Sequence, residues 1–303
     1  NDGRMDLFVT DMHSDMSEQV EPEREKEKSR MLHRDQHLPT SGSSIFGNAF
    51  FRSEGAGRFR EVSDLIGVEN YWPWGVSVGD LNADGYQDLL VTASMNYPYR
   101  YGVNSLFLND RGRGFLDSEF VLGIEPRRGG RTAQPWFELD CFGADRGHRH
   151  CLEQGADLRP GKRRGRIVVW GALGSRAAAI IDLDGDGDLD IVTNEFNAQP
   201  MVLLSDLSAR KPLLRYLKIE LVGTRSNRSG LGAKVSIRTG ARTYVQVRDG
   251  KSGYLSQSLF PLYFGLGEAE TVDQIEIQWP SGRKQVVSGP IATNGLIEVT
   301  ESP

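Results

Sequence analysis

Polar and apolar positions in this chain alternate in short runs that predict strands rather than helices. From about Pro212 to the end, seven such runs follow one another, separated by Gly, Pro and charged residues. They read YLKIELVG, AKVSIRTG, TYVQVRDG, PLYFGLG, QIEIQWP, KQVVSG and GLIEVT. Short alternating strands at this spacing are typical of a β-sandwich or a small barrel. We therefore predict a β-rich domain over 212–303 and a domain boundary near residue 212.

An internal repeat organises the first part of the chain. DLNADGYQDLLVT begins at Asp80 and DLDGDGDLDIVTN begins at Asp182, and both read D-L-x-x-D-G-x-x-D before an apolar run. A short apolar strand precedes each copy, in GVSVGD and AAAIID. The N-terminal residues NDGRMDLFVTD match the second half of the pattern, with Asp2, Gly3 and Asp6 at the matching positions. We expect the chain to begin inside a repeat, as an N-terminal truncation.

A hairpin pattern lies between the acidic stretches. NAFFRSEGAGRFREVS, from Asn48, and NSLFLNDRGRGFLDSE, from Asn104, each contain an apolar strand, a Gly-rich turn and a Phe that opens the next strand. The repeating unit is strand, acidic loop, strand and hairpin over residues 1–211. It is longer than the roughly 40–50 residues of a typical propeller blade. We assign the excess to insertions near 13–44 and 125–165, the first being charged and partly helical.

Oxygen-bearing residues in the two acidic stretches have the spacing of a calcium loop. Such a loop has oxygen ligands at positions 1, 3, 5, 7 and 9, with the backbone carbonyl used at 7 and glycine at 6. The predicted ligands are Asp80, Asn82, Asp84, the Tyr86 carbonyl and Asp88 in the first loop, and Asp182, Asp184, Asp186, the Asp188 carbonyl and Asp190 in the second. Position 12 is Val91 or Thr193, not the bidentate Glu of an EF-hand, and the flanks are strand-like. These are therefore predicted to be calcium loops between strands.

The partial N-terminal copy retains Asp2, the Arg4 carbonyl and Asp6 as candidate ligands. Because positions 1 and 3 are missing, it should bind calcium poorly. The alternative for any one loop is a metal-free turn, since Asp and Gly are common turn residues. Two complete copies with the same spacing favour Ca²⁺ over that alternative. Mg²⁺ is disfavoured because it prefers a strict octahedron and retains its waters.

At these residues the chain resembles a known family. The pattern D-x-[DN]-x-D-G-x-x-D-[LI] after a short apolar strand is similar to the FG-GAP/VCBS repeats of calcium-bearing β-propellers. GTRSNRSGLGAKVSI, DGKSGYLSQSLFPLYFGLG and IQWPSGRKQ, in that order, resemble the ASPIC/UnbV domain. Together they resemble the cartilage acidic protein-like family. The resemblance implies an all-β fold, with a partial calcium-bearing propeller followed by a small sandwich-like domain. It also implies an extracellular adhesion or matrix role without catalysis.

Composition narrows the class of partner. The net charge of −5 gives no electrostatic case for nucleic-acid binding. No apolar run approaches the roughly 18–20 residues needed to span a bilayer.

The two cysteines, Cys141 and Cys151, flank His148 and His150 in CFGADRGHRHC. A disulfide is the favoured reading and would indicate an oxidising compartment, with two free thiols or a zinc site as alternatives.

Two further motifs suggest other functions. GVSVG at 75–79 matches the G-x-S-x-G of hydrolases, but it runs directly into an acidic loop, whereas a nucleophile elbow leads into a helix. YWPW at 71–74 and YPYRY at 97–101 could form a platform for sugar, although packing between blades is favoured.

The functional prediction is a non-catalytic, calcium-binding protein of the extracellular space or cell envelope that mediates adhesion, matrix or protein interaction. Its partner is expected to be a protein or a glycan. The alternative is a carbohydrate-binding or polysaccharide-processing accessory protein that uses the aromatic clusters. A pair of carboxylates facing a cleft would favour that alternative.

Overall fold

A computed structural model describes residues 3–11, 48–70, 72–94, 102–153 and 165–303. These residues are mostly strands, which confirms the predicted all-β class. The described helices are short: α1 (Ser63–Ile66), the 3₁₀ turn η5 (Arg128–Gly130), α2 (Arg149–Glu153) and α3 (Leu207–Arg210). Asp2 and the insertion predicted near 13–44 lie outside the described residues.

Three antiparallel sheets follow one another along the first two thirds of the chain. The first contains β1 (Leu7–Val9), β2 (Ala49–Gly55) and β3 (Arg58–Glu61); the second contains β4 (Pro73–Gly79), β5 (Asp88–Ala93), β6 (Ser105–Asn109) and β7 (Phe115–Asp117); the third contains β10 (Gly174–Ile181), β11 (Asp190–Phe196) and β12 (Met201–Leu203). Within each sheet the strands pair in chain order, as in the blades of a β-propeller. The described sheets do not close into a ring.

The repeat read from the sequence has a structural counterpart in all three sheets. The last aspartate of each acidic stretch accepts a hydrogen bond from a backbone N–H on or just beyond the next strand of its sheet. The pairs are Asp6 with Ser53 at 2.7 Å, Asp88 with Asn109 at 2.8 Å and Asp190 with Ser205 at 2.8 Å. This carboxylate therefore positions the neighbouring strand, whatever else it binds.

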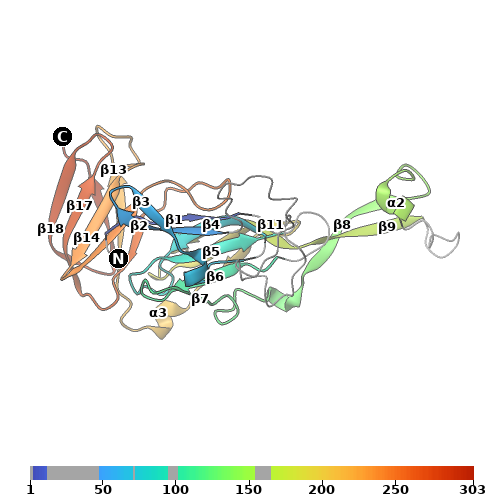
Figure 1. Ribbon diagram of the computed structural model, residues 1–303, viewed down its shortest axis with the longest axis horizontal. Coiled ribbons are helices and arrows are strands. Elements are labelled where there is room, and N and C mark those ends of the chain that lie inside the picture. The colour runs from blue at the N-terminus through green and yellow to red at the C-terminus, as the bar shows by residue number, and fades with distance from the viewer. Residues whose placement is uncertain (1–2, 12–47, 71, 95–101, 154–164) are drawn as a thin grey trace.

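An arm interrupts the series between the second and third sheets. β8 (Ala133–Asp140) and β9 (Arg166–Ala172) pair with each other and project away from the other sheets, with α2 near the tip (Figure 1). Cys141 and Cys151 form a disulfide that packs with Leu139 and Ile167 in a small core. The favoured reading of the two cysteines is confirmed, and the thiol and zinc alternatives are wrong.

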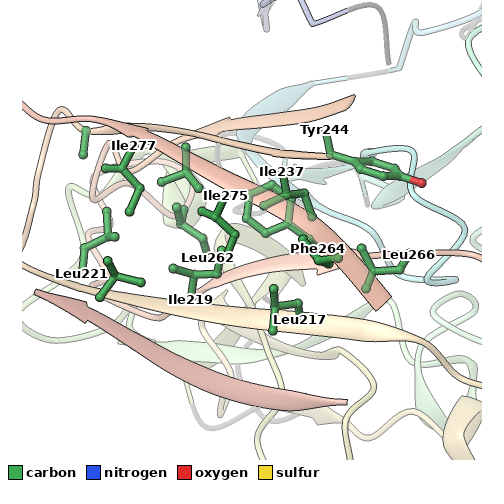
Figure 2. Close-up of a cluster of buried hydrophobic side chains, with 14 of the residues drawn as sticks. Leu217, Ile219, Leu221, Ile237, Tyr244, Leu262, Phe264, Leu266, Ile275 and Ile277 are labelled. Atoms are coloured by element: carbon green, nitrogen blue, oxygen red, sulfur yellow. The ribbon is translucent and has the colours of Figure 1, made fainter. Parts of the chain in front are cut away.

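All seven strands predicted after residue 212 are present. They are β13 (Tyr216–Val222), β14 (Lys234–Thr239), β15 (Arg242–Val247), β16 (Leu262–Gly265), β17 (Thr271–Gln278), β18 (Lys284–Ala292) and β19 (Gly295–Thr300). They form one sheet in the order β16-β13-β19 and a second in the order β15-β14-β17-β18. Side chains from both sheets share one core, as Figure 2 shows for Leu217 and Ile219 against Ile237 and Ile275. The C-terminal region is a two-sheet sandwich.

A carboxylate near the C-terminus, that of Glu301, ties the segment after β13 to the turn before β18 by hydrogen bonds. Glu301 is 1% exposed and accepts backbone N–H bonds from Thr224, Arg225 and Ser226 at 2.7–2.9 Å. The Ser281 hydroxyl donates to its other oxygen at 2.6 Å. Burial alone would raise the pKa of Glu301, but these hydrogen bonds outweigh it and lower the pKa to about 2.

Replacing Glu301 with glutamine should lower the melting temperature by several degrees at neutral pH, because glutamine cannot accept this set of N–H bonds. Since the folded pKa lies below the ordinary value of 4.5, the contribution of Glu301 is present above pH 4.5 and is lost as the pH falls toward 2. Thermal melts of wild type and E301Q should therefore converge in acid. E298Q, at an exposed position on β19, is the matched control. Equal melting temperatures at pH 7 would contradict this role.

Candidate metal centre

The first acidic loop, 80–88, joins β4 to β5 and folds around its own carboxylates. Asp80 accepts the backbone N–H groups of Asp84 and Gly85 at 3.0 and 2.8 Å. Asp88 accepts that of Leu81 at 2.8 Å. Gly85 has φ = +92°, which explains glycine at position 6 of the loop. The loop is thus shaped with both terminal aspartates inside it, 1% and 0% exposed.

The electrostatics of this loop favour a cation. Burial raises the pKa of Asp80 well above its usual range, and the charges of Asp88 and Asp84 raise it further. Burial likewise raises the pKa of Asp88 to about 7, against the lowering effect of its backbone hydrogen bonds. Among the described residues, no lysine, arginine or histidine forms an ion pair with these carboxylates. A bound cation would relieve both the burial cost and the mutual repulsion.

The second loop, 182–190, joins β10 to β11 and has a similar course. Asp182 accepts the N–H groups of Gly185 and Gly187 at 2.8 and 3.2 Å, and Asp190 accepts that of Leu183 at 2.8 Å. One carboxylate oxygen each from Asp182, Asp184 and Asp190 lie within 4.8 Å of one another. Three of the four side-chain ligands predicted in this loop therefore converge.

The side chains of Asp186 and Asp188 make hydrogen bonds that the predicted set of calcium ligands did not include. The Asp186 carboxylate is exposed and accepts hydrogen bonds from the Ser208 hydroxyl and the Asp188 N–H. Burial alone would raise its pKa, but these hydrogen bonds dominate and lower it. Asp188, expected to offer its carbonyl, has a fully buried side chain whose Oδ2 accepts the Ser208 N–H at 2.6 Å. Its Oδ1 has no hydrogen-bond partner among the described residues.

Both loops carry the donor types of a hard divalent cation, but among the described residues only the second loop brings three carboxylates within 4.8 Å of one another. Carboxylate, amide and carbonyl oxygens are the donor set that Ca²⁺ takes, usually six to eight at a time. The first loop would supply Asp80, Asn82, Asp84, the Tyr86 carbonyl and Asp88, and the second the convergent trio. The buried, unpartnered oxygen of Asp188 also lies in the second loop. In the partial N-terminal copy, Arg4 and Asp6 are exposed, so the structure gives that copy no comparable enclosure.

The C-terminal sandwich packs directly on both loops, a feature that the sequence did not reveal. A Cβ added to Gly85 would lie 2.5 Å from the ring of Tyr244, and one added to Gly187 would lie 2.4 Å from the ring of Tyr216. Figure 2 shows the Tyr244 hydroxyl pointing away from the sandwich core. The glycine at position 6 of each loop therefore has two roles: it adopts the positive φ of the turn, and its missing side chain leaves room for a tyrosine ring from the sandwich.

Polar contacts reinforce this docking. The Tyr263 hydroxyl donates to the Gly187 carbonyl at 2.9 Å. Lys218 of β13 pairs with Asp182 in the second loop, and Lys211, in the segment that leads into the sandwich, donates to the carbonyls of Asn82 and Ala83 in the first. Because these partners are far apart in sequence, no local pattern could have paired them.

Ser77 in the GVSVG motif lies within strand β4, not on an elbow. Its side chain is buried and donates to the Ala178 carbonyl at 2.7 Å, linking the second and third sheets. Of the aromatic clusters, Trp72 is buried, and Trp74 lies against the Arg176 guanidinium and the edge of Tyr254. These described residues are engaged in packing; Tyr71 and residues 97–101 lie outside the described residues.

Comparison with known proteins supports the class suggested by this fold and site. Residues 1–91 match the FG-GAP-like repeat family, and residues 223–303 match the ASPIC and UnbV family. The chain thus contains an FG-GAP-like repeat region and a C-terminal ASPIC and UnbV domain, as its motifs predicted.

Its relatives include cartilage acidic protein 1 from three vertebrates. The chain is 29% identical to the Homo sapiens protein over 292 residues, 86% of this chain and 42% of that protein. The values are 27% over 288 residues for Mus musculus, 87% of this chain and 43% of the relative, and 26% over 282 residues for Xenopus tropicalis, 83% and 41%. The chain therefore spans about two fifths of the length of these relatives. None of the helices described has the length and apolarity required to cross a bilayer.

Proposed function

We propose that this chain is a non-catalytic, calcium-stabilised interaction module of the extracellular space or cell envelope. In this proposal, residues 1–211 form part of a propeller and 212–303 form the domain docked on its loops. The observation that carries it is the pair of buried carboxylates in the first loop, Asp80 and Asp88, with no ion-pair partner among the described residues. Their spacing recurs in the second loop, where three carboxylates converge.

Two observations support the extracellular placement. The Cys141–Cys151 disulfide fits an oxidising compartment, because such bonds persist mainly outside the reducing cytosol. The relatives carry a name that associates them with cartilage. We propose a protein partner, since the described residues of the aromatic clusters, Trp72 and Trp74, are already engaged in packing.

The proposed lack of catalysis is supported by the contacts of the groups that could act in catalysis, namely the Ser77 hydroxyl and the carboxylates of the second loop. The Ser77 hydroxyl is buried and bonded to a backbone carbonyl in a neighbouring sheet. The convergent carboxylates Asp182, Asp184 and Asp190 belong to a loop with calcium spacing. Their proposed work is to hold a cation that fixes the strands on either side.

Removal of calcium should lower the melting temperature. A metal that binds only the folded state stabilises it by about 2.7 kcal/mol at one hundred times its dissociation constant. Differential scanning calorimetry of protein stripped with a chelator should show a lower transition that millimolar Ca²⁺ restores and equal Mg²⁺ does not. Superimposable melts with and without Ca²⁺, together with no heat of Ca²⁺ binding, would refute the calcium proposal.

A further inference from the structure

One lysine from the chain beyond β12 contacts each acidic loop, but the two lysines bind different kinds of atom. Lys211 Nζ lies 2.9 Å from the Asn82 carbonyl oxygen and 3.2 Å from that of Ala83 in the first loop. Lys218 Nζ instead lies 2.7 Å from Oδ2 of Asp182, the position-1 carboxylate of the second loop. The second loop therefore has an ammonium group on one of its three convergent carboxylates, whereas the lysine at the first loop binds backbone oxygens.

Lys218 is held in this position by its surroundings. It lies on β13 directly opposite Tyr263 of β16, whose hydroxyl donates to the Gly187 carbonyl of the same loop. Tyr216 and Tyr263 stack beside it, 5.4 Å apart and 11° from parallel. The Lys218 and Asp182 side chains are 22% and 3% exposed, so solvent screens the pair less than it would at the surface. The ammonium group is thus positioned by packing as well as by charge.

We propose that Lys218 is a built-in competitor for the cation of the second loop, which makes the two loops unequal. This rests on the proposed function, namely that both loops bind calcium. Asp182 Oδ1 already accepts the Gly185 N–H, and Oδ2 is the oxygen that Lys218 holds. A Ca²⁺ ion that takes Oδ2 lies a few ångströms from a like charge, and such proximity opposes binding. The first loop is then the tight site, and the second fills at higher calcium as Lys218 withdraws.

The competition links the second site to the docking of the sandwich. Lys218 belongs to the sandwich and Asp182 to the third sheet, so their ion pair is one of the contacts between these two parts. If calcium and this contact exclude each other, each must weaken the other by the same factor. Calcium at the second loop therefore loosens one attachment of the sandwich, while calcium at the first loop leaves the Lys211 contacts in place.

The direct test measures calcium at the second loop alone. The substitution D80N disables the first loop, and isothermal titration calorimetry then follows the remaining site in D80N, D80N/K218M and D80N/K251M. Lys251 lines the same 630 Å³ cavity as Lys218 and Asp182 and is the matched control. K218M should tighten calcium binding about tenfold to a hundredfold, the scale on which a nearby charge alters proton binding. K251M should leave the affinity within about twofold.

An unchanged or weaker affinity in D80N/K218M, or an equal gain in both lysine variants, would overturn the competition. The charge-retaining variant D80N/K218R should bind calcium as weakly as D80N. If protein with both loops intact binds no calcium at all, the proposed function fails together with this inference. If it binds two ions but K218M has no effect, only the inference fails.

A second readout requires no substitution. Acylation of lysines followed by mass spectrometry should modify Lys218 slowly in chelator, because its amine is paired with Asp182. The rate should rise severalfold once Ca²⁺ is high enough to fill the second site, while the rate at Lys251 stays constant. A Lys218 rate that ignores calcium across the range in which both sites fill would contradict the proposed displacement.

Discussion

Glu195→Gln is expected to destabilise the fold by about 3–5 kcal/mol, the usual cost of leaving a buried charge without its partner. The side chain of Glu195 is fully buried and pairs with Arg127, whose side chain is 5% exposed. The Ser175 hydroxyl donates to Glu195 at 2.6 Å and accepts from Arg127 at 2.9 Å. Asn104, beside strand β6, donates to the same hydroxyl at 2.9 Å. The network joins the second and third sheets, so its loss should affect the whole unit.

Urea denaturation measures this effect directly, because a lower midpoint at unchanged slope reports lost stability. The double variant R127M/E195M should be much closer to wild type, since it removes both charges and leaves neither buried alone. D206N breaks the exposed pair with Arg210 and should cost less than about 1 kcal/mol. An E195Q midpoint no lower than that of D206N would show that the buried pair contributes no more to the free energy of unfolding than the exposed pair does.

Asp80→Asn should abolish most of the stabilisation that calcium gives. Position 1 of the first loop would lose its charge, and the loss of a ligand should weaken binding at least as much as the 10–100-fold typical of a supporting residue. In calorimetric melts, the shift on adding 1 mM Ca²⁺ should shrink well below that of wild type. D110N, in the exposed β6–β7 turn, removes the same charge elsewhere and should retain the full shift. A full calcium shift in D80N would place the stabilising ion at another site.

The features that could be predicted from sequence were those that depend on residues close together in the chain. Strand alternation from Tyr216 to Thr300 specified all seven strands because the period-2 pattern is local. The spacing from Asp182 to Asp190 predicted that carboxylates would converge, and three do. The assignment of Asp186 as a ligand stays a prediction; its side chain accepts a hydrogen bond from Ser208, two strands further on.

Long-range contacts were beyond that reasoning. Nothing near Gly187 in the sequence indicates Tyr216, and nothing near Asp182 indicates Lys218. The Arg127–Glu195 pair was also missed, because charged side chains are usually solvated and the two residues are 68 positions apart in the chain. The disulfide stayed one of three readings, since a spacing of ten residues fits more than one chemistry. The domain boundary near residue 212 stays a prediction.

The β8–β9 arm departs from the rest of the molecule and returns to it at a single point, because Ala133 and Ala172 are directly paired at its base. A segment whose two ends are neighbours can be lengthened, shortened or exchanged without changing the register of any other strand. The outer part of the arm has its own small core and a disulfide, whereas near the base Trp136 contacts Phe196 of β11. The outer part of the arm is therefore a suitable position for inserting a tag or a different binding loop, because such a change leaves the acidic loops and the sandwich in place.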